Sequence, residues 1–248
     1  MIEILNLHHR YPDGTYAIKG IDLTIPEGEF LLVCGLNGSG KTTLIRIVSG
    51  LLSPTAGTVR VNGIDVAHTP KEVRRLVGMV FQDADSQIIG ETVREDVAFG
   101  PENLGLSPEE IDRRVDGSLQ LMGLEGVAEK PCYLLSGGEK RRLSIAGVLA
   151  MKPQILLFDE PFTHLDYRGT REVVRHMIHL HRENHTLIVA THEVEKVIPF
   201  VDRIAVIHAG EIKAAGPPER LVEELSHFEI CPPYSGLLAR ERITWPPK

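Results

Sequence analysis

The start of the chain alternates apolar and polar residues, which is the period of a β-strand with one buried face. The alternation runs through the first seven residues and returns at 21–25, and turn signals follow at 12–14 (Pro-Asp-Gly) and 26–28 (Pro-Glu-Gly). Residues 58–63 then predict a hairpin whose turn is Asn-Gly. We expect an antiparallel β-unit whose buried positions include Ile2, Ile4, Ile21, Leu23 and Ile25.

Four later apolar runs do not alternate, and they lie at 30–34, 77–81, 155–158 and 186–190. A continuous apolar run is expected where a strand is buried on both faces, as in a parallel sheet. A helical pattern with apolar residues at 44, 47, 48 and 51 follows the first run. The predicted fold class is therefore α/β.

Two further helices have start signals in the sequence. Ser107-Pro-Glu-Glu110 has the form of a capping box with proline at the first helical position, and Gly123 closes that helix. Leu135-Ser-Gly-Gly-Glu139 opens the second helix, and Pro153 ends it. The buried stripe of the first is expected at Ile111, Val115, Leu119 and Met122, and that of the second at Leu143, Ile145, Ala146 and Leu149.

Composition limits the function classes without choosing one. The 248 residues suffice for one domain with subdomains, and the net charge of -7 provides no global attraction to nucleic acid. The sequence contains no run of about 18 apolar residues, the length that a membrane-spanning helix needs. The first residues carry an acid where a signal peptide has basic residues. Cys34, Cys132 and Cys231 lack metal-type spacing. We expect a reduced, cytoplasmic protein whose cysteines pack as small apolar side chains and which has no nucleic-acid partner.

The most specific chemical signal is Gly35-Leu-Asn-Gly-Ser-Gly-Lys-Thr-Thr43, which lies between the first continuous run and its helix. The spacing G-x-x-x-x-G-K-T matches a phosphate-binding P-loop, in which backbone N–H groups surround the phosphates at the positive end of a helix. Lys41 would reach the β and γ phosphates, and the Thr42 hydroxyl would coordinate Mg²⁺. Gly38 and Gly40 stand where a Cβ would obstruct the backbone or where φ is positive.

Polar residues follow three of the other buried strands. Asp159 and Glu160 follow 155–158, and we expect Asp159 to bind Mg²⁺ and Glu160 to polarise an attacking water. Gln82 follows 77–81 and could reach Mg²⁺ or orient a water from a mobile loop; the alternative is a solvated loop amide. His192 follows 186–190 and could donate to a γ-phosphate oxygen, although a structural histidine is the alternative.

Two weaker signals concern the nucleotide. Ser136-Gly-Gly at a helix start would make a second anion-binding terminus, and the alternative is a simple N-cap. Tyr11 could stack on an adenine ring, and the alternative is a turn tyrosine that covers the sheet edge.

Along the chain these motifs follow one another in an order that resembles that of the ATP-binding-cassette (ABC) ATPases over residues 1 to about 225. The order is the P-loop, Gln82, Leu-Ser-Gly-Gly-Glu139, Asp159-Glu160, Leu165-Asp166 and His192. Within that family the chain looks most like the energy-coupling-factor ATPases of vitamin and cobalt or nickel importers, through the segments at 11–14, 80–83, 96–101 and 145–151. The resemblance implies a P-loop NTPase fold with a RecA-like core, an antiparallel β subdomain and an inserted helical subdomain at about 84–151. Residues 226–248 would form a C-terminal extension that packs across the body or contributes to dimerisation.

The resemblance also implies a mechanism. Two ATPase subunits, identical or paralogous, pair head to tail with ATP between the P-loop of one and the Ser136 segment of the other, and hydrolysis requires closure. An integral membrane subunit would dock a short helix in a groove of the helical subdomain, placing the chain on the cytoplasmic face of the membrane. Implied catalytic residues are Glu160, His192 and Gln82; Mg²⁺ ligands are Thr42, Gln82 and Asp159; nucleotide contacts are Tyr11, Gly35, Asn37, Gly38, Ser39, Gly40, Lys41, Thr42, Thr43, Ser136, Gly137, Gly138, Glu139 and Asp166.

Two positions depart from the family pattern. Position 139 is Glu where the family usually has Gln; a carboxylate accepts a bond from a ribose hydroxyl but cannot donate one. His164 stands where the family prefers a small residue, near the expected dimer interface. A soluble ABC ATPase of assembly or maintenance remains the alternative function. The short separation of Lys41 and Ser136 leaves no room for the long coiled coil of the DNA-maintenance branch, so the assembly branch is the one that survives.

Two further clusters have interpretations that need no ligand. The four histidines at 176, 179, 181 and 185 could suggest a metal site, but a helix places the first two and the last two on nearly opposite sides, which favours a solvated helix face. Residues 140–142 (Lys-Arg-Arg) are expected on an exposed face of the helix that begins after Ser136, near the nucleotide or a partner; the alternative is a nucleic-acid site.

Overall fold

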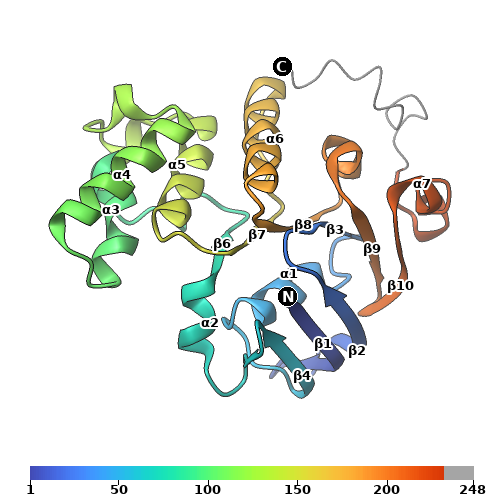
Figure 1. The fold of residues 1–248 in the computed structure, drawn as a ribbon. Helices are drawn as coiled ribbons and strands as arrows, with labels where there is room; N and C mark the ends of the chain where they lie inside the picture. Colours follow the sequence, from blue (N-terminus) through green and yellow to red (C-terminus); the bar gives the residue numbers. More distant parts are fainter. Residues whose placement is uncertain (232–248) are drawn as a thin grey trace.

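The computed structural model describes residues 1–231, and residues 232–248, most of the expected C-terminal extension, lie outside the described part. A central sheet carries α6 on one face and the N-terminal sheet with α1 on the other, while α3, α4 and α5 pack together to one side (Figure 1). Within the described residues, no helix is both long and apolar enough to cross a bilayer. The helices are α1 (Lys41–Val48), α2 (Pro70–Leu76), α3 (Val93–Asn103), α4 (Pro108–Met122), α5 (Gly137–Ala150), α6 (Tyr167–Arg182) and α7 (Pro218–Leu221).

The central sheet has the strand order β10-β9-β3-β8-β7-β6. All its strand pairs are parallel except that of β9 with β10. Phe30 of β3 lies beside Leu187 of β8, and Val80 of β6 lies beside Phe158 of β7. Parallel order brings the carboxyl ends of the strands to one edge, where the candidate residues follow. The strands are β3 (Phe30–Cys34), β6 (Val77–Val80), β7 (Ile155–Asp159), β8 (Thr186–Thr191), β9 (Arg203–His208) and β10 (Glu211–Gly216).

The alternating segments at the start of the chain form the second sheet, of order β2-β1-β4-β5, with antiparallel pairs. Asn62 and Gly63 both have positive φ, as the predicted Asn-Gly hairpin turn requires. Its strands are β1 (Ile2–Arg10), β2 (Tyr16–Ile25), β4 (Ala56–Val61) and β5 (Ile64–Asp65).

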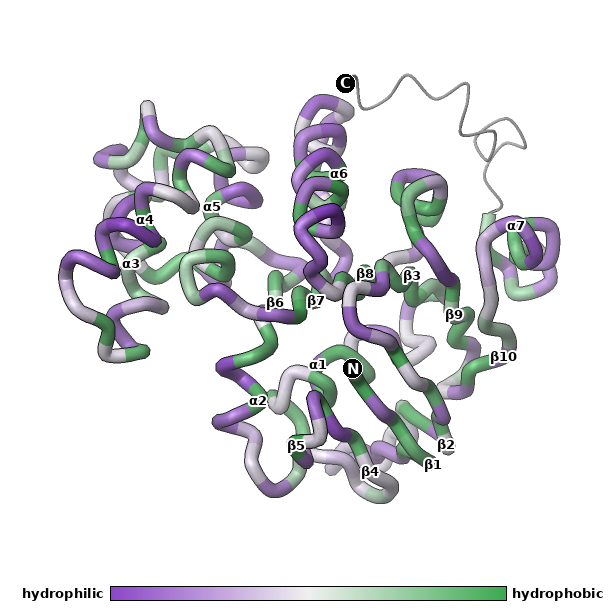
Figure 2. The backbone as a smooth tube through the Cα atoms, viewed as in Figure 1, coloured by the Kyte–Doolittle hydropathy of each residue, from purple (hydrophilic) through white to green (hydrophobic). Residues whose placement is uncertain are grey.

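The central sheet is buried on both faces because alternate residues of each strand enter different clusters. On β3, Phe30 and Leu32 pack with α6 and the lateral helices, whereas Leu31 and Val33 pack with α1 and the N-terminal sheet. The inner strands β3, β7 and β8 are accordingly hydrophobic along most of their length, whereas the edge strand β10 is partly exposed and α6 has many hydrophilic residues (Figure 2). Cys34 and Cys132 belong to the apolar core, as expected, whereas Cys231 is exposed. Burial raises the pKa of the Cys34 thiol to about 12.

The start of α4 corrects one detail of the sequence interpretation. Ser107 is the N-cap and accepts from the Glu110 N–H, but the Glu110 carboxylate does not return to the Ser107 N–H as a capping box requires. That carboxylate instead binds Arg113 and Arg114. These charge-assisted bonds hold the pKa of Glu110 down to about 2. Only half of the predicted motif therefore forms.

The expectation of solvated histidines on α6 is wrong for His176, which is 6% exposed. His181 also has partners, since its ring contacts Phe30 and its Nε2 lies 3.4 Å from an Asp202 carboxylate oxygen. Burial, assisted by Arg175 and Arg142, lowers the pKa of His176 to about 4. Within the described residues no three His, Cys, Asp or Glu side chains gather as metal ligands.

His176 is expected to make folding stability depend on pH. Its pKa is lower in the folded than in the unfolded state, so the unfolded state binds more protons between about pH 6.5 and 4, and stability falls as pH falls through that range. Relative to pH 7, the loss at pH 5 is about 2 kcal/mol. Urea unfolding at both pH values should show that His176→Leu removes this share of the loss. The same change at exposed His179 is the control, and an equal effect there would contradict the assignment.

Candidate active site

The loop between β3 and α1 has the backbone that its glycines predict. Gly38 and Gly40 have φ of 78° and 112°, values that L side chains rarely adopt. A Cβ on Gly40 would also lie 2.7 Å from the Ala17 carbonyl oxygen, and one on Gly35 would lie 2.2 Å from that of Ile207. The loop therefore winds tightly into the start of α1, with Asn37 exposed at its outer side.

Lys41 begins α1 and turns its ammonium back into this loop. Its Nζ donates to the carbonyl oxygens of Gly35 at 2.8 Å and Leu36 at 3.1 Å, and it lies 3.4 Å from Glu160 Oε1. The side chain is only 5% exposed. The nearby Ser39 hydroxyl is buried without a hydrogen-bond partner among the described residues. A buried cation beside an unpaired hydroxyl is an arrangement that fits an anionic group such as phosphate.

Thr42 and Asp159 form a second polar contact at the same edge. The Thr42 hydroxyl donates to Asp159 Oδ1 at 2.8 Å. Burial raises the pKa of Asp159, and the Thr42 hydrogen bond and the positive charges of Arg46 and Lys41 oppose that shift. Hydroxyl and carboxylate oxygens are ligands that Mg²⁺ prefers, so the donor set fits this ion.

Glu160 is buried and held from one side. Its Oε2 accepts from the Thr191 hydroxyl at 2.8 Å and lies 3.1 Å from His192 Nδ1. Among residues 1–231 its Oε1 has no hydrogen-bond partner, although Lys41 Nζ is 3.4 Å away. One oxygen is thus fixed by the protein while the other faces the loop cation and can accept a proton from a bound molecule.

The two acids do not point to opposite sides, as simple strand alternation would suggest. Glu160 has φ of 43°, so the backbone leaves the extended conformation directly after β7, and both carboxylates turn toward the loop. Thr191, which orients Glu160, is a functional residue that we did not predict from the sequence. Its only signal was a hydroxyl at the end of a buried strand, where an apolar residue would otherwise fit.

Tyr11 is also brought to the loop. Its hydroxyl lies 3.0 Å from that of Thr43, and its ring packs edge-on against His9 with centroids 4.7 Å apart. The side chain is partly exposed. Tyr11 therefore stands beside the candidate phosphate site with part of its surface open.

Gln82 follows β6 and lies exposed at the same sheet edge as Asp159, because β6 and β7 are parallel neighbours. The loop after it is more firmly held than we expected. The Gln87 side chain accepts from Phe81 N–H at 3.0 Å and donates to the carbonyl oxygens of Met79 and Ser144. Lys140 on α5 also pairs with Asp85.

The segment Ser136–Glu139 and the P-loop of the same chain do not line a common site. Ser136 is the N-cap of α5 in a complete capping box with Glu139. The hollow beside it, about 480 Å³, is lined by the α5 start together with His164 and residues at the start of α6, whose N-cap is Asp166. No residue of the loop 35–43 is among those that line it. Gly137 and Gly138 border this open hollow.

The two unusual positions and the basic run can now be placed. Hydrogen bonds from Ser136 lower the pKa of Glu139, and Lys130 and Arg142 assist, so position 139 carries a compensated negative charge. His164 is exposed with φ of 61°. The expectation of an exposed basic face is wrong for Arg141, which is 3% exposed and donates to the carbonyl oxygens of Phe81 and Gln82.

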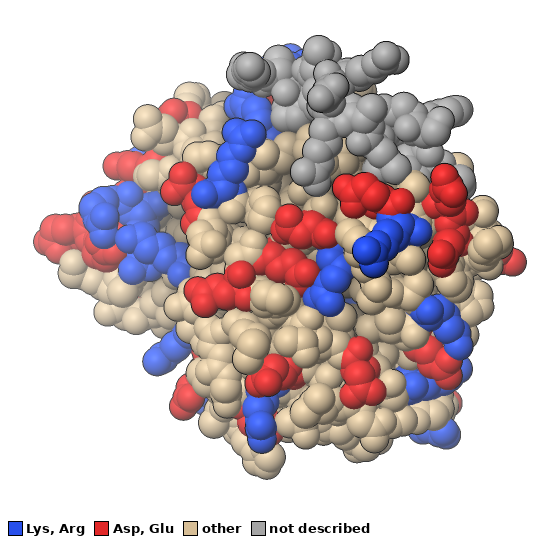
Figure 3. Space-filling model, turned by 45° about the vertical axis from the view of Figure 1, so that its right-hand side comes forward, with Lys and Arg blue, Asp and Glu red and all other residues tan. Residues whose placement is uncertain are grey.

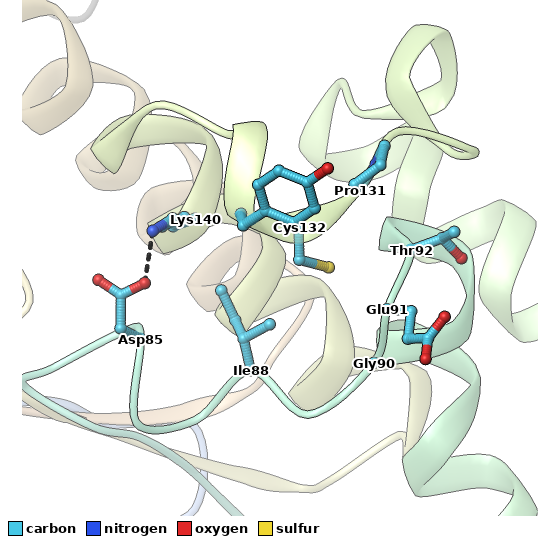
Figure 4. A pocket seen from close by; sticks show the side chains of 9 residues that line it. Asp85, Ile88, Gly90, Glu91, Thr92, Pro131, Cys132 and Lys140 are labelled. Atoms are coloured by element: carbon cyan, nitrogen blue, oxygen red, sulfur yellow. Dashed lines mark hydrogen bonds and ion pairs between the residues drawn. The ribbon is translucent and has the colours of Figure 1, made fainter.

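A groove of about 460 Å³ opens between the loop after β6 and the segment before α5 (Figure 4). Ile88 lies at its floor, the Asp85–Lys140 pair at one end and Glu91 at the other, while the neighbouring Tyr133 is 78% exposed. Elsewhere, on the face drawn in Figure 3, acidic and basic side chains are interspersed rather than separated by sign. The groove is thus an apolar floor with charged rims.

The sequence of the chain is similar to those of known proteins. The family model described as "ABC transporter" matches residues 18–163. A protein of Methanocaldococcus jannaschii named "Energy-coupling factor transporter ATP-binding protein EcfA" is 41% identical over 228 residues, which are 91% of this chain and 82% of that protein. The protein of the same name from Methanothermobacter thermautotrophicus is 44% identical over 221 residues, or 88% and 71% of the two chains.

Solved structures agree with these relatives. The structure of cbiO1 from Clostridium perfringens, described as part of the ABC transporter complex cbiONQ, is 35% identical with a TM-score of 0.83 and covers 91% of this chain and 92% of its own. A dimeric ATP-binding cassette, MJ0796, in a post-hydrolysis state bound to ADP and Pi is 31% identical with a TM-score of 0.80, covering 88% and 99%.

Proposed function

The chain belongs to the ABC transporter family, and from that premise we propose that it is the ATP-hydrolysing subunit of a membrane importer of the energy-coupling-factor type. The family membership and the P-loop NTPase fold predicted from the motifs are both confirmed by the comparisons. The observation that carries the proposal is the gathering of Lys41, the Thr42–Asp159 contact and Glu160 at one place, on a chain whose relatives bear that transporter name. Cobalt, nickel or a vitamin is the proposed cargo.

In this proposal ATP lies with its phosphates in the loop that follows β3. Gly35, Asn37, Gly38, Ser39, Gly40, Thr43 and the Lys41 ammonium surround them, and Tyr11 stacks on the adenine. Glu160 accepts the proton of the attacking water at its unbonded Oε1. His192, which contacts the same carboxylate, donates to the γ-phosphate.

Thr42, Asp159 and Gln82 are the residues that would hold Mg²⁺. The fit rests on the Thr42–Asp159 contact and on the position of Gln82 at the same sheet edge. When bound, the ion neutralises charge on the phosphate oxygens. The protein residues themselves fix where these oxygens can lie. Burial raises the pKa of Asp159, and the Thr42 bond and the charges of Arg46 and Lys41 oppose that shift.

The second half of the site comes from another ATPase subunit, identical or paralogous, in a head-to-tail dimer that closes on ATP. Support comes from the separation of Ser136–Glu139 and its hollow from the P-loop within one chain, and from the dimeric solved relative. Ser136, Gly137, Gly138, Glu139 and Asp166 would then contact ATP bound by the partner. Without a partner the phosphates are covered on one side only.

We further propose that the groove in Figure 4 receives a helix of an integral membrane subunit, placing the chain at the cytoplasmic face of the membrane. The proposed domain division is 1–225 as the ATPase domain, with about 84–151 as its helical subdomain. Affinity purification of the full chain from solubilised membranes tests the function. A multi-spanning protein should copurify, and its repeated absence would favour a soluble ABC ATPase of assembly or maintenance.

A charge placed in this groove should weaken binding of the membrane subunit. Tyr133→Glu places a charge at the edge of the apolar floor and should reduce recovery of the membrane subunit at least about tenfold, since exposed aromatic anchors often dominate an interface. Leu5→Glu, at an exposed position of β1 outside the groove, is the matched control. Quantitative immunoblotting of copurified membrane protein measures both. Equal recovery with both variants would contradict the docking site.

A further inference from the structure

Arg141 is buried at the start of α5, and the groups to which its guanidinium donates are main-chain carbonyls. Within residues 1–231 its Nε has no hydrogen-bond partner. Its other two nitrogens donate to the main-chain carbonyls of Phe81 and Gln82. Burial lowers the pKa of its guanidinium, and the charges of Asp83 and Asp159 oppose that shift without forming an ion pair with it. Removing a guanidinium from water is costly, and the two main-chain hydrogen bonds that offset this cost tie α5 to the segment after β6.

The carbonyls that it holds belong to the proposed catalytic glutamine and to the residue before it. Phe81 is also held through its N–H by Gln87, which reaches Ser144 one turn further along α5. Lys140, next to Arg141, pairs with Asp85 in the same loop. Contacts of Lys140, Arg141 and Ser144 thus attach the segment 81–87 to α5, the helix whose N-cap is Ser136.

We propose that Arg141 is a positioning residue for ATP hydrolysis, which fixes the main chain of Gln82 to the Ser136 helix so that the two move as one unit. This rests on the proposed role of Gln82. When α5 shifts relative to the central sheet as the dimer closes, Gln82 is carried with it toward Asp159. A contact from the P-loop of one chain to Ser136 of the other is then transmitted within the second chain to its own Gln82.

A double-mutant cycle on the full chain tests this. Arg141→Gln should lower kcat about tenfold with the KM for ATP changed less than about threefold, because positioning acts on the reaction rather than on nucleotide binding. In a Gln82→Ala background the same change should have no further effect. Losses that multiply in the double variant would overturn the proposal.

Hydrogen exchange separates the link from the function. Amides of residues 82–87 should exchange faster in Arg141→Gln and keep the parental rate in Arg114→Gln, whose guanidinium donates to the carbonyls of Ala150 and Met151 instead. Arg141→Lys, which keeps a cation, should be intermediate and guards against misfolding. Unchanged exchange in Arg141→Gln refutes the link. If exchange is faster in Arg141→Gln but ATP turnover in Gln82→Ala is parental, the role of Gln82 is refuted and the link between Arg141 and the segment 82–87 stands.

Discussion

Glu160→Gln should lower ATP turnover by at least about 100-fold, which is the usual contribution of a general base. An amide keeps the shape of the side chain and can still accept from the Thr191 hydroxyl, so the site should remain assembled. It cannot take the water proton at the position of Oε1. Nucleotide affinity should be retained, because the change also reduces the negative charge near the phosphates. A closed dimer should therefore accumulate with ATP.

Phosphate release, equilibrium ATP binding and size-exclusion chromatography measure these three results. Glu29→Gln is the matched control, since Glu29 is also mostly buried and pairs with Arg203, but it lies at the opposite end of β3. It should lower the melting temperature and leave turnover within about threefold. Parental turnover in Glu160→Gln would remove this residue from the mechanism.

A mixed dimer of two inactive chains should regain about half of the parental turnover, since one of its two sites is intact. One chain carries Lys41→Ala, which removes the cation of its P-loop. The other carries Ser136→Asp, which keeps a helix-capping oxygen but opposes phosphate with negative charge. In the mixed dimer, the intact P-loop of the second chain faces the intact Ser136 of the first.

Coproduction with two different affinity tags provides the mixed dimer, and phosphate release measures its activity. Each variant alone should be inactive yet folded by circular dichroism. A chain with both changes, paired with the Ser136→Asp chain, is the control and should stay inactive because neither site is intact. A purified mixed dimer without activity would contradict a site shared between chains.

Local patterns were sufficient for the scaffold of the site. Strand periodicity, the glycine spacing and the polar residues after each buried run depend on neighbours within a few positions, and the strands at Phe30–Cys34 and Ile155–Asp159 formed where the pattern predicts. Parallel order then brings the carboxyl ends of the strands together without further information. The Thr42–Asp159 contact follows from that topology.

Long-range contacts decided what the sequence could not. Arg141 looked solvated because charged residues flank it, and only the packing of the loop after β6 against α5 buries it. His176 was misread for the same reason, since its burial depends on the helices that α6 meets. The error at Glu110 was local instead: two arginines three and four residues further along the same helix outcompeted the helix cap.

Two non-glycine residues with positive φ, Glu160 and His164, lie in the short segment that leads from β7 to Asp166. Each such conformation costs roughly 1–2 kcal/mol for an L-residue. A glycine at either position would relieve that strain. Selection for thermal tolerance alone would therefore be expected to favour glycine at both positions, and at position 160 this change would remove the carboxylate. Persistence of Glu160 in a tolerant variant would then report that selection for activity had opposed selection for stability.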